Sequence, residues 1–197
     1  MRILVYLAVG VALACWGASA MAEEAAASKV GLEAHGLWAF NFNDDEDEGS
    51  NADDTFGGGA SFVFGLHENI KLDIGADYYK PKSDDESDLK AQFIPVCAAL
   101  RFGGNLESVF LYAGGGAGYS FNSLDVEGAS SSDIDLDDCM VYFACGGAEF
   151  NLNEDLYIRG EFRYNWMKPE LNVKIADEKF DVKFDHMQLR AGLGFNF

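Results

Sequence analysis

The chain ends in the ten residues Gln188-Leu189-Arg190-Ala191-Gly192-Leu193-Gly194-Phe195-Asn196-Phe197, in which apolar side chains alternate with polar residues or glycine. A period of two residues is the period of a β-strand that has one apolar and one polar face. A final strand of this kind fits a closed barrel, in which it pairs with the first strand and leaves no open edge. The C-terminal stretch therefore predicts a β-barrel.

The N-terminus has the features of a secretory leader. Arg2 is the only charged residue before Glu23, and an apolar run follows it over residues 3–14. Small residues at 18–20 and at 20–22 offer two alternative cleavage sites. The apolar run is too short to span a bilayer, which disfavours a retained anchor helix.

These features divide the chain into a signal peptide over 1–22, a short segment over 23–29 and a barrel domain over 30–197. A lipoprotein anchored at Cys15 is an alternative, although the residues before this cysteine fit the lipidation signal poorly. Export of a barrel through a cleaved signal peptide indicates the outer membrane of a Gram-negative bacterium.

The composition agrees with a membrane barrel and excludes one class of partner. Mean hydropathy is −0.06, which a transmembrane barrel permits because its lipid-facing residues alternate with lumen residues. The net charge of −19 makes nucleic acid an improbable partner, since binding to a phosphate backbone needs a basic surface. We expect no cofactor and a monomeric protein.

Three cysteines remain after the leader: Cys97, Cys139 and Cys145. None stands in a spacing typical of metal ligands, and an odd number in an oxidising compartment leaves at least one thiol unpaired within the chain. We interpret them as small apolar filling residues, with one disulfide bond as the alternative.

Eight segments alternate with a period of two, and the links between them alternate in length. The segments are 30–43, 55–67, 70–80, 91–102, 109–121, 139–150, 156–166 and 184–197. The short links are 67–69, 103–108 and 151–155, and the long links are 44–54, 81–90, 122–138 and 169–183. Outer-membrane barrels have short periplasmic turns and long external loops, so we predict a closed, eight-stranded, antiparallel transmembrane β-barrel.

The alternation alone does not decide which face meets lipid, because a soluble barrel would place its apolar face inside. The apolar faces end in aromatic residues such as Trp38 and Trp166, as an interfacial girdle requires. The polar faces carry balanced charges, which we predict to form a salt-bridged plug in a lumen too narrow for a channel. The predicted plug residues are Glu33, Lys71, Asp73, Asp77, Arg101, Glu149, Arg159, Glu161, Arg163 and Arg190.

Several stretches resemble the small outer-membrane β-barrel superfamily that contains OmpA-type, OmpX-type and opacity-protein barrels. They are Ile94-Pro95-Val96, the glycine-rich run 112–119, the segment 156–164 and the terminal strand. The resemblance covers about residues 30–197. It implies that the barrel assembly machinery of the outer membrane reads the C-terminal strand, with Arg190, Gly192, Phe195 and Phe197 as its signal.

Some barrels of similar size are enzymes acting on lipid A, and the deacylase type has a serine two residues after its histidine. Here Leu37, Asn69 and Gln188 occupy that position after the three histidines. Nucleophilic catalysis needs a positioned base and an orienting partner, so the sequence predicts no enzyme.

The first long link, 44–54, carries the densest run of acidic residues. Asp44, Glu46 and Glu48 are weak candidates for a divalent cation that bridges the loop to lipopolysaccharide, because hard cations take carboxylate ligands. Solvated, mutually repelling loops are the simpler interpretation. We therefore predict a structural or surface-interaction barrel in contact with membrane lipid and lipopolysaccharide, with a small cation-preferring pore as the alternative.

Overall fold

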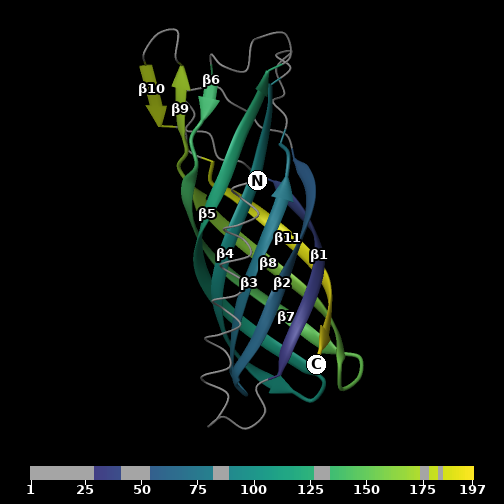
Figure 1. Ribbon diagram of the computed structural model, residues 1–197. Coiled ribbons are helices and arrows are strands. Elements are labelled where there is room, and N and C mark those ends of the chain that lie inside the picture. Colours follow the sequence, from purple (N-terminus) through teal and green to yellow (C-terminus); the bar gives the residue numbers. More distant parts are fainter. Residues whose placement is uncertain (1–28, 41–53, 82–88, 127–133, 174–177, 182–183) are drawn as a thin grey trace.

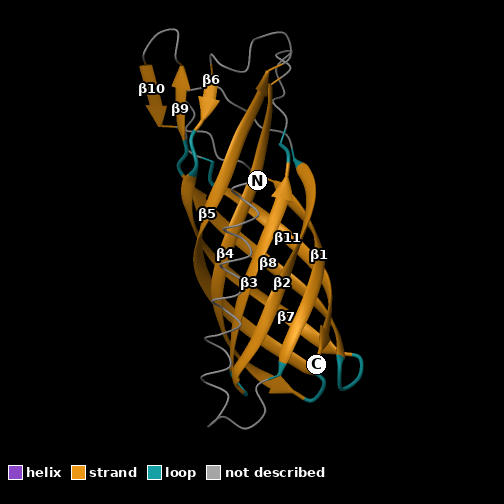
Figure 2. Ribbon diagram, in the orientation of Figure 1, coloured by secondary structure: helices purple, strands orange, loops and turns teal. Residues whose placement is uncertain are grey.

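A computed structural model describes residues 29–40, 54–81, 89–126, 134–173, 178–181 and 184–197. Its described part consists of strands and loops (Figure 2). Among these residues no helix combines the length and the apolar composition needed to cross a membrane. The predicted leader, 1–22, lies outside the described residues.

Eight strands form one closed antiparallel barrel in which the last strand pairs with the first, which confirms the predicted fold (Figure 1). The barrel strands are β1 (Val30–Phe40), β2 (Thr55–His67), β3 (Ile70–Tyr79), β4 (Leu89–Leu106), β5 (Val109–Val126), β7 (Cys139–Asn151), β8 (Leu156–Met167) and β11 (His186–Asn196). The closing register runs from Gly31 opposite Asn196 to Phe40 opposite Met187. The C-terminus lies at the end with the short turns, which we take as the periplasmic end.

The hairpin of β4 and β5 is longer than the alternation predicts. Its ladder runs from Leu89 opposite Val126 to Leu106 opposite Val109, so the turn holds only Glu107 and Ser108. Each of the two strands has 18 residues, whereas a tilted strand crosses a bilayer with about ten. Figure 1 shows the pair rising beyond the other barrel strands at the external end.

Two links predicted as long loops, 122–138 and 169–183, contain short strands and pair with each other. They form a three-stranded sheet from β6 (Ile134–Leu136), β9 (Glu170–Val173) and β10 (Glu178–Asp181). This sheet lies at the external end beside β5 (Figure 1). Strands of three or four residues carry too little periodicity to be seen in the sequence, and β6 pairs with β9, a strand of a different link.

The two faces of the wall differ as the alternation predicts. Bulky apolar side chains such as Phe102, Ile158 and Leu193 point outward and are about half exposed, as lipid-facing residues are in a protein without its bilayer. Charged and polar side chains point inward and are buried. On the outer face, Trp38 stacks on Phe40 with ring centroids 4.6 Å apart, at the external end of β1.

The inner face also carries an apolar layer that the alternation does not reveal. It lies at the external end of the lumen and contains Leu37, Tyr79, Phe93, Val141 and Met167, each at most 3% exposed. Both faces of β7 are apolar at this height, so Glu149, lower on the same strand, is the residue that indicates which side chains enter the lumen.

Two residues from outside the strand interiors complete the apolar layer. Leu136 of β6 is 4% exposed and packs into the same cluster as the barrel residues. The Phe184 ring lies 5.3 Å from the Phe93 ring, centroid to centroid. The external end of the lumen is therefore filled by side chains of the wall and of the connections above it.

Candidate functional site

The candidate site is the network of charged side chains inside the barrel. Six strands supply it: β3 and β8 each place three of the ten charged side chains on the inner face, and β1, β4, β7 and β11 each place one. Each of the ten side chains named from the sequence has at least one ion-pair partner inside the lumen. Apart from the pair of Arg163 with Glu161 within β8, these pairs join different strands of the barrel.

Asp73 lies at the centre of this network. One of its carboxylate oxygens accepts a hydrogen bond from Arg101, and the other accepts one from Arg159 Nη1 at 2.8 Å. Arg101 also pairs with Glu149, and Arg159 Nη2 lies 2.5 Å from Glu33 Oε1. Each arginine thus bridges two carboxylates, which compensates the cost of burying these charges.

The periplasmic end of the network is closed by Lys71. Its ammonium group pairs with Glu149 and lies 4.5 Å from the centroid of the Phe110 ring and 5.8 Å from that of Tyr157. The Lys71 side chain is 24% exposed, whereas the carboxylate it pairs with is fully buried. This lysine is therefore the point at which the network meets solvent.

A second group of charges lies toward the external end. Asp77 accepts hydrogen bonds from Arg190 and, at 2.8 Å, binds His35 Nε2. Glu161 accepts hydrogen bonds from Arg163 Nη2 at 2.9 Å and from the Tyr112 hydroxyl at 2.9 Å.

A polar chain continues from this group toward the external mouth. Arg190 Nε donates to Gln188 Oε1 at 3.1 Å, and Gln188 Nε2 lies 3.0 Å from His186 Nε2. His186 Nδ1 lies 2.9 Å from the carbonyl oxygen of Phe184. The chain thus connects the charge network to the backbone beside the apolar layer.

Five further residues are buried in the lumen and were not among the predicted plug residues: His35, Tyr112, Asn165, His186 and Gln188. They share inner-face parity with the charged residues, and that parity is the signal that identifies them. The sequence does not show which of them meet across the lumen.

Close packing in the lumen requires glycine at specific inner positions. The Phe143 ring occupies the space in which a Cβ on Gly116 would stand. The same ring stacks under the guanidinium group of Arg163, which lies 3.8 Å from the ring centroid. Likewise the Tyr157 ring covers Gly194, its direct partner across the β8–β11 ladder. Any side chain at either glycine would displace an aromatic ring.

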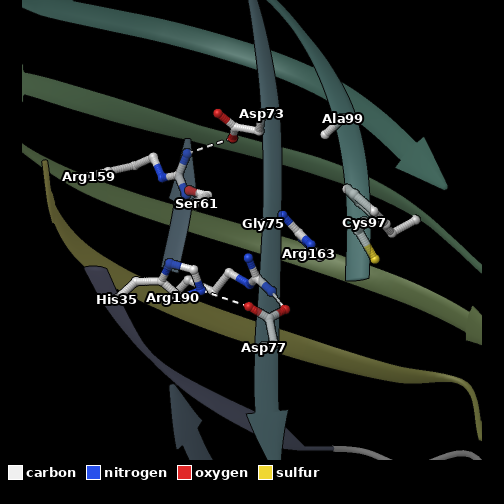
Figure 3. A pocket seen from close by; sticks show the side chains of 11 residues that line it. His35, Ser61, Asp73, Gly75, Asp77, Cys97, Ala99, Arg159, Arg163 and Arg190 are labelled. Atoms are coloured by element: carbon white, nitrogen blue, oxygen red, sulfur yellow. Dashed lines mark hydrogen bonds and ion pairs between the residues drawn. The ribbon is translucent and has the colours of Figure 1, made fainter. Parts of the chain in front are cut away.

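A small cavity remains between the charge network and the wall of β2, β3 and β4 (Figure 3). Its volume is about 20 Å³, which is room for about one water-sized particle. The lining residues are His35, Ser61, Asp73, Gly75, Asp77, Cys97, Ala99, Phe143, Arg159, Arg163 and Arg190.

Three of these residues, Ser61, His35 and Asp77, are the types found in a nucleophilic triad. The hydrogen bond between His35 and Asp77 is present, but no hydrogen bond joins Ser61 to His35 within the described part of the chain. The cavity is also too small for a substrate. The arrangement lacks the contact between nucleophile and base that such catalysis requires.

The remaining candidates from the sequence give a mixed result. Cys97, Cys139 and Cys145 are free thiols, so no disulfide bond joins any two of them. The candidates Asp44, Glu46 and Glu48 lie outside the described residues. Within the described ranges, no group of three or more His, Cys, Asp and Glu side chains is arranged to hold a metal ion.

The residues of the expected assembly signal lie on both faces of β11 and, for Phe197, directly after its last residue. Phe195 and Phe197 are 51% and 70% exposed on the lipid side, while Arg190 is buried in the lumen. Gly192 lies under Glu33, whose carboxylate oxygen would be 2.7 Å from an added Cβ. Recognition of this strand by the assembly machinery stays a prediction.

Comparison with protein families matches residues 8–197 to a model described as outer membrane protein beta-barrel domain. The chain belongs to this family. It is therefore an outer membrane protein of the Gram-negative type, as the leader and the alternation indicated. The boundaries expected at residues 22 and 29 stay predictions.

Solved structures of small outer membrane barrels are similar to this chain. OprG from Pseudomonas aeruginosa is 18% identical, with 87% of this chain and 96% of that chain covered and a TM-score of 0.61. Neisserial surface protein A is 17% identical, with 86% of this chain and 97% of that chain covered and a TM-score of 0.60. Outer membrane protein W of Escherichia coli is 16% identical, with 87% of this chain and 98% of that chain covered and a TM-score of 0.59. Curated proteins give no match. At these identities the likeness shows the fold alone.

Proposed function

We propose that this outer membrane barrel is closed to ions and acts through its external end, in a structural or surface-interaction role without enzymatic activity. The observation that carries the proposal is the filled lumen. The ten charged residues pair with one another, and the buried apolar layer lies above them. An ion crossing the barrel would have to break ion pairs in a site of low dielectric and then pass between packed rings.

The alternative function is a small cation-preferring pore, in which the acidic loops would concentrate cations at the mouth. Conductance of the refolded protein in a planar bilayer separates the two functions. We expect no steady openings from the unmodified protein. Openings should appear after Arg159→Ala/Glu161→Ala, because this change removes two ion-paired side chains from the inner face of one strand.

A matched control on the same strand is Ile158→Ala/Phe162→Ala, whose side chains face lipid. This variant should stay silent if the lumen contacts block the ions. Steady, cation-selective openings from the unmodified protein would overturn the closed barrel and establish the pore.

We further propose that the external loops contact lipopolysaccharide and that divalent cations bridge the acidic residues to its phosphates. The acidic composition of residues 44–54 supports this part of the proposal. Calorimetry of the folded protein with Ca²⁺ tests it, beside a variant with Asp44→Asn, Glu46→Gln and Glu48→Gln. Absence of binding at millimolar Ca²⁺ would end the cation-bridge proposal.

A further inference from the structure

One of the side chains that fill the external end of the lumen does not come from the barrel wall. Leu136 belongs to β6, and its side chain is 4% exposed in the apolar layer. β6 pairs with β9, and among the described residues no strand ladder joins it to a barrel strand. Residues 134–138, which we call the strap, therefore place a side chain in the lumen without being part of the barrel.

The strap is fastened to the wall by Asn122 of β5. The ladder between β5 and β7 ends at Ser120 opposite Cys139, so Asn122 lies beyond it. The backbone N–H of Asn122 donates to Asp138 Oδ1 at 2.8 Å, and its Nδ2 donates to the carbonyl oxygen of Asp137 at 2.8 Å. The hydroxyl of Ser120, a fully buried residue, donates to Asn122 Oδ1 at 2.6 Å and so fixes the orientation of the amide.

The other connection that reaches the apolar layer is held in a different way. Phe184 contributes its ring, and its backbone N–H donates to the carbonyl oxygen of Met167 at 2.9 Å. The backbone N–H of Met167 donates to Asp185 Oδ1 at 3.1 Å. These bonds continue the pairing of β8 with β11, so Phe184 is held as part of the wall. The strap depends instead on one buried side chain and on the bonds of Asn122, and few buried contacts give a low free energy of local opening.

We propose that the strap is a releasable lid over the external end of the lumen, with Leu136 as its stopper and Asn122 as its latch. Opening breaks the bonds of Asn122 and withdraws Leu136, while the charge network and the barrel ladder stay intact. Because β6 is bonded to β9, a partner held by the sheet of β6, β9 and β10 changes the opening equilibrium of the lid. The inference rests on the proposed surface-interaction role, for which the lid supplies a route from the external surface to the lumen.

A thiol in place of the stopper reports opening directly. The reporter chain carries Leu136→Cys as its only thiol after the leader, with the native cysteines removed by Cys97→Ala, Cys139→Ala and Cys145→Ala. In the barrel refolded into phospholipid vesicles, a water-soluble maleimide should label this thiol slowly, because the lid is closed most of the time.

Adding Asn122→Asp to the reporter chain keeps the size of the latch but places a carboxylate oxygen against the carbonyl oxygen of Asp137. The labelling rate should rise about tenfold, since a buried acceptor is left without its donor when the lid is closed. The matched control is Ser123→Ala, at the exposed neighbouring position of the same strand, and it should leave the rate unchanged. If Asn122→Asp gives no folded band in gel electrophoresis, Asn122→Ala replaces it and should also raise the rate.

Two results would overturn the lid. An unchanged labelling rate in the folded Asn122 variant would show that this residue is no latch. Labelling of the reporter chain as fast as that of a thiol introduced by Ser123→Cys would show that Leu136 does not close the lumen. Conductance keeps this proposal separate from the preceding one: steady openings from the unmodified protein would overturn the closure to ions, whereas the labelling rates alone decide the lid.

Discussion

Removal of Arg101 tests whether the buried charges are balanced as a unit. This side chain is fully buried, pairs with Asp73 and Glu149, and lies 4.9 Å from the centroid of the Tyr112 ring. Arg101→Met keeps most of its volume but leaves one negative charge in excess inside the lumen. Breaking a buried ion pair from one side costs about 3–5 kcal/mol.

The structure places the expected cost at the lower end of this range. Asp73 keeps Arg159 and Glu149 keeps Lys71, so neither carboxylate is left without a cation. We expect Arg101→Met to lower the free energy of unfolding by about 3 kcal/mol. Arg101→Met/Glu149→Gln restores the charge balance, and its cost should fall to about 1 kcal/mol because Lys71 can reach solvent.

Urea unfolding in phospholipid vesicles, followed by tryptophan fluorescence, measures both values. Leu100→Met on the lipid side of the same strand is the control and should cost less than about 1.5 kcal/mol. The reasoning would be refuted if the double variant were at least as unstable as the single one, since charge balance would then not govern the stability of the lumen.

Three further changes test the packing. Gly194→Val should abolish the heat-modifiable folded band in gel electrophoresis because the new side chain meets the Tyr157 ring, whereas Gly160→Ala, with open space around its Cβ position, should keep that band. Glu107→Gly should raise the free energy of unfolding by about 1 kcal/mol in urea titrations, since Glu107 has a φ of 55°, and an unchanged midpoint would contradict the strain. Phe93→Ala should cost about 3–5 kcal/mol in the same titrations because this side chain is 1% exposed in the apolar layer; a cost below 1 kcal/mol would show that the layer is loosely packed.

The barrel itself was predictable because most strands alternate clearly between an apolar and a polar face. In β8 the residues Arg159, Glu161 and Arg163 alternate with apolar neighbours, so the period gives the strand, its length and the inner face together. Alternation of short and long links supplied the topology. Each of these signals lies within one short stretch of sequence, so the period of two residues is enough to detect it.

The pairing inside the lumen was not predictable for the opposite reason. Strand parity shows that Asp77 and Arg190 share the interior, but their meeting depends on the register of strands 113 residues apart. In β7, Val141 and Phe143 enter the lumen while Tyr142 faces lipid; the parity set by Glu149 predicts this, but it does not show that the inner side chains form an apolar layer with other strands. The cavity beside Ser61 depends on the sizes of side chains from several strands, which no single stretch of sequence contains.

The ion pairs explain how a barrel with a polar interior reaches one register. A slip of one residue between neighbouring strands turns every inner side chain outward. For Arg159 or Arg190 this would mean a guanidinium in hydrocarbon, which costs about 2–4 kcal/mol near the bilayer midplane, in addition to the loss of Asp73 or Asp77 as partner. Contact of apolar side chains with lipid stabilises every register that keeps these side chains outside. It therefore does not distinguish the observed register from one shifted by two residues. Such a slip keeps the faces and separates the charge partners by two positions, about 7 Å along the strand. The specific pairing of charges across β3, β4, β8 and β11 is therefore the feature that selects the observed register.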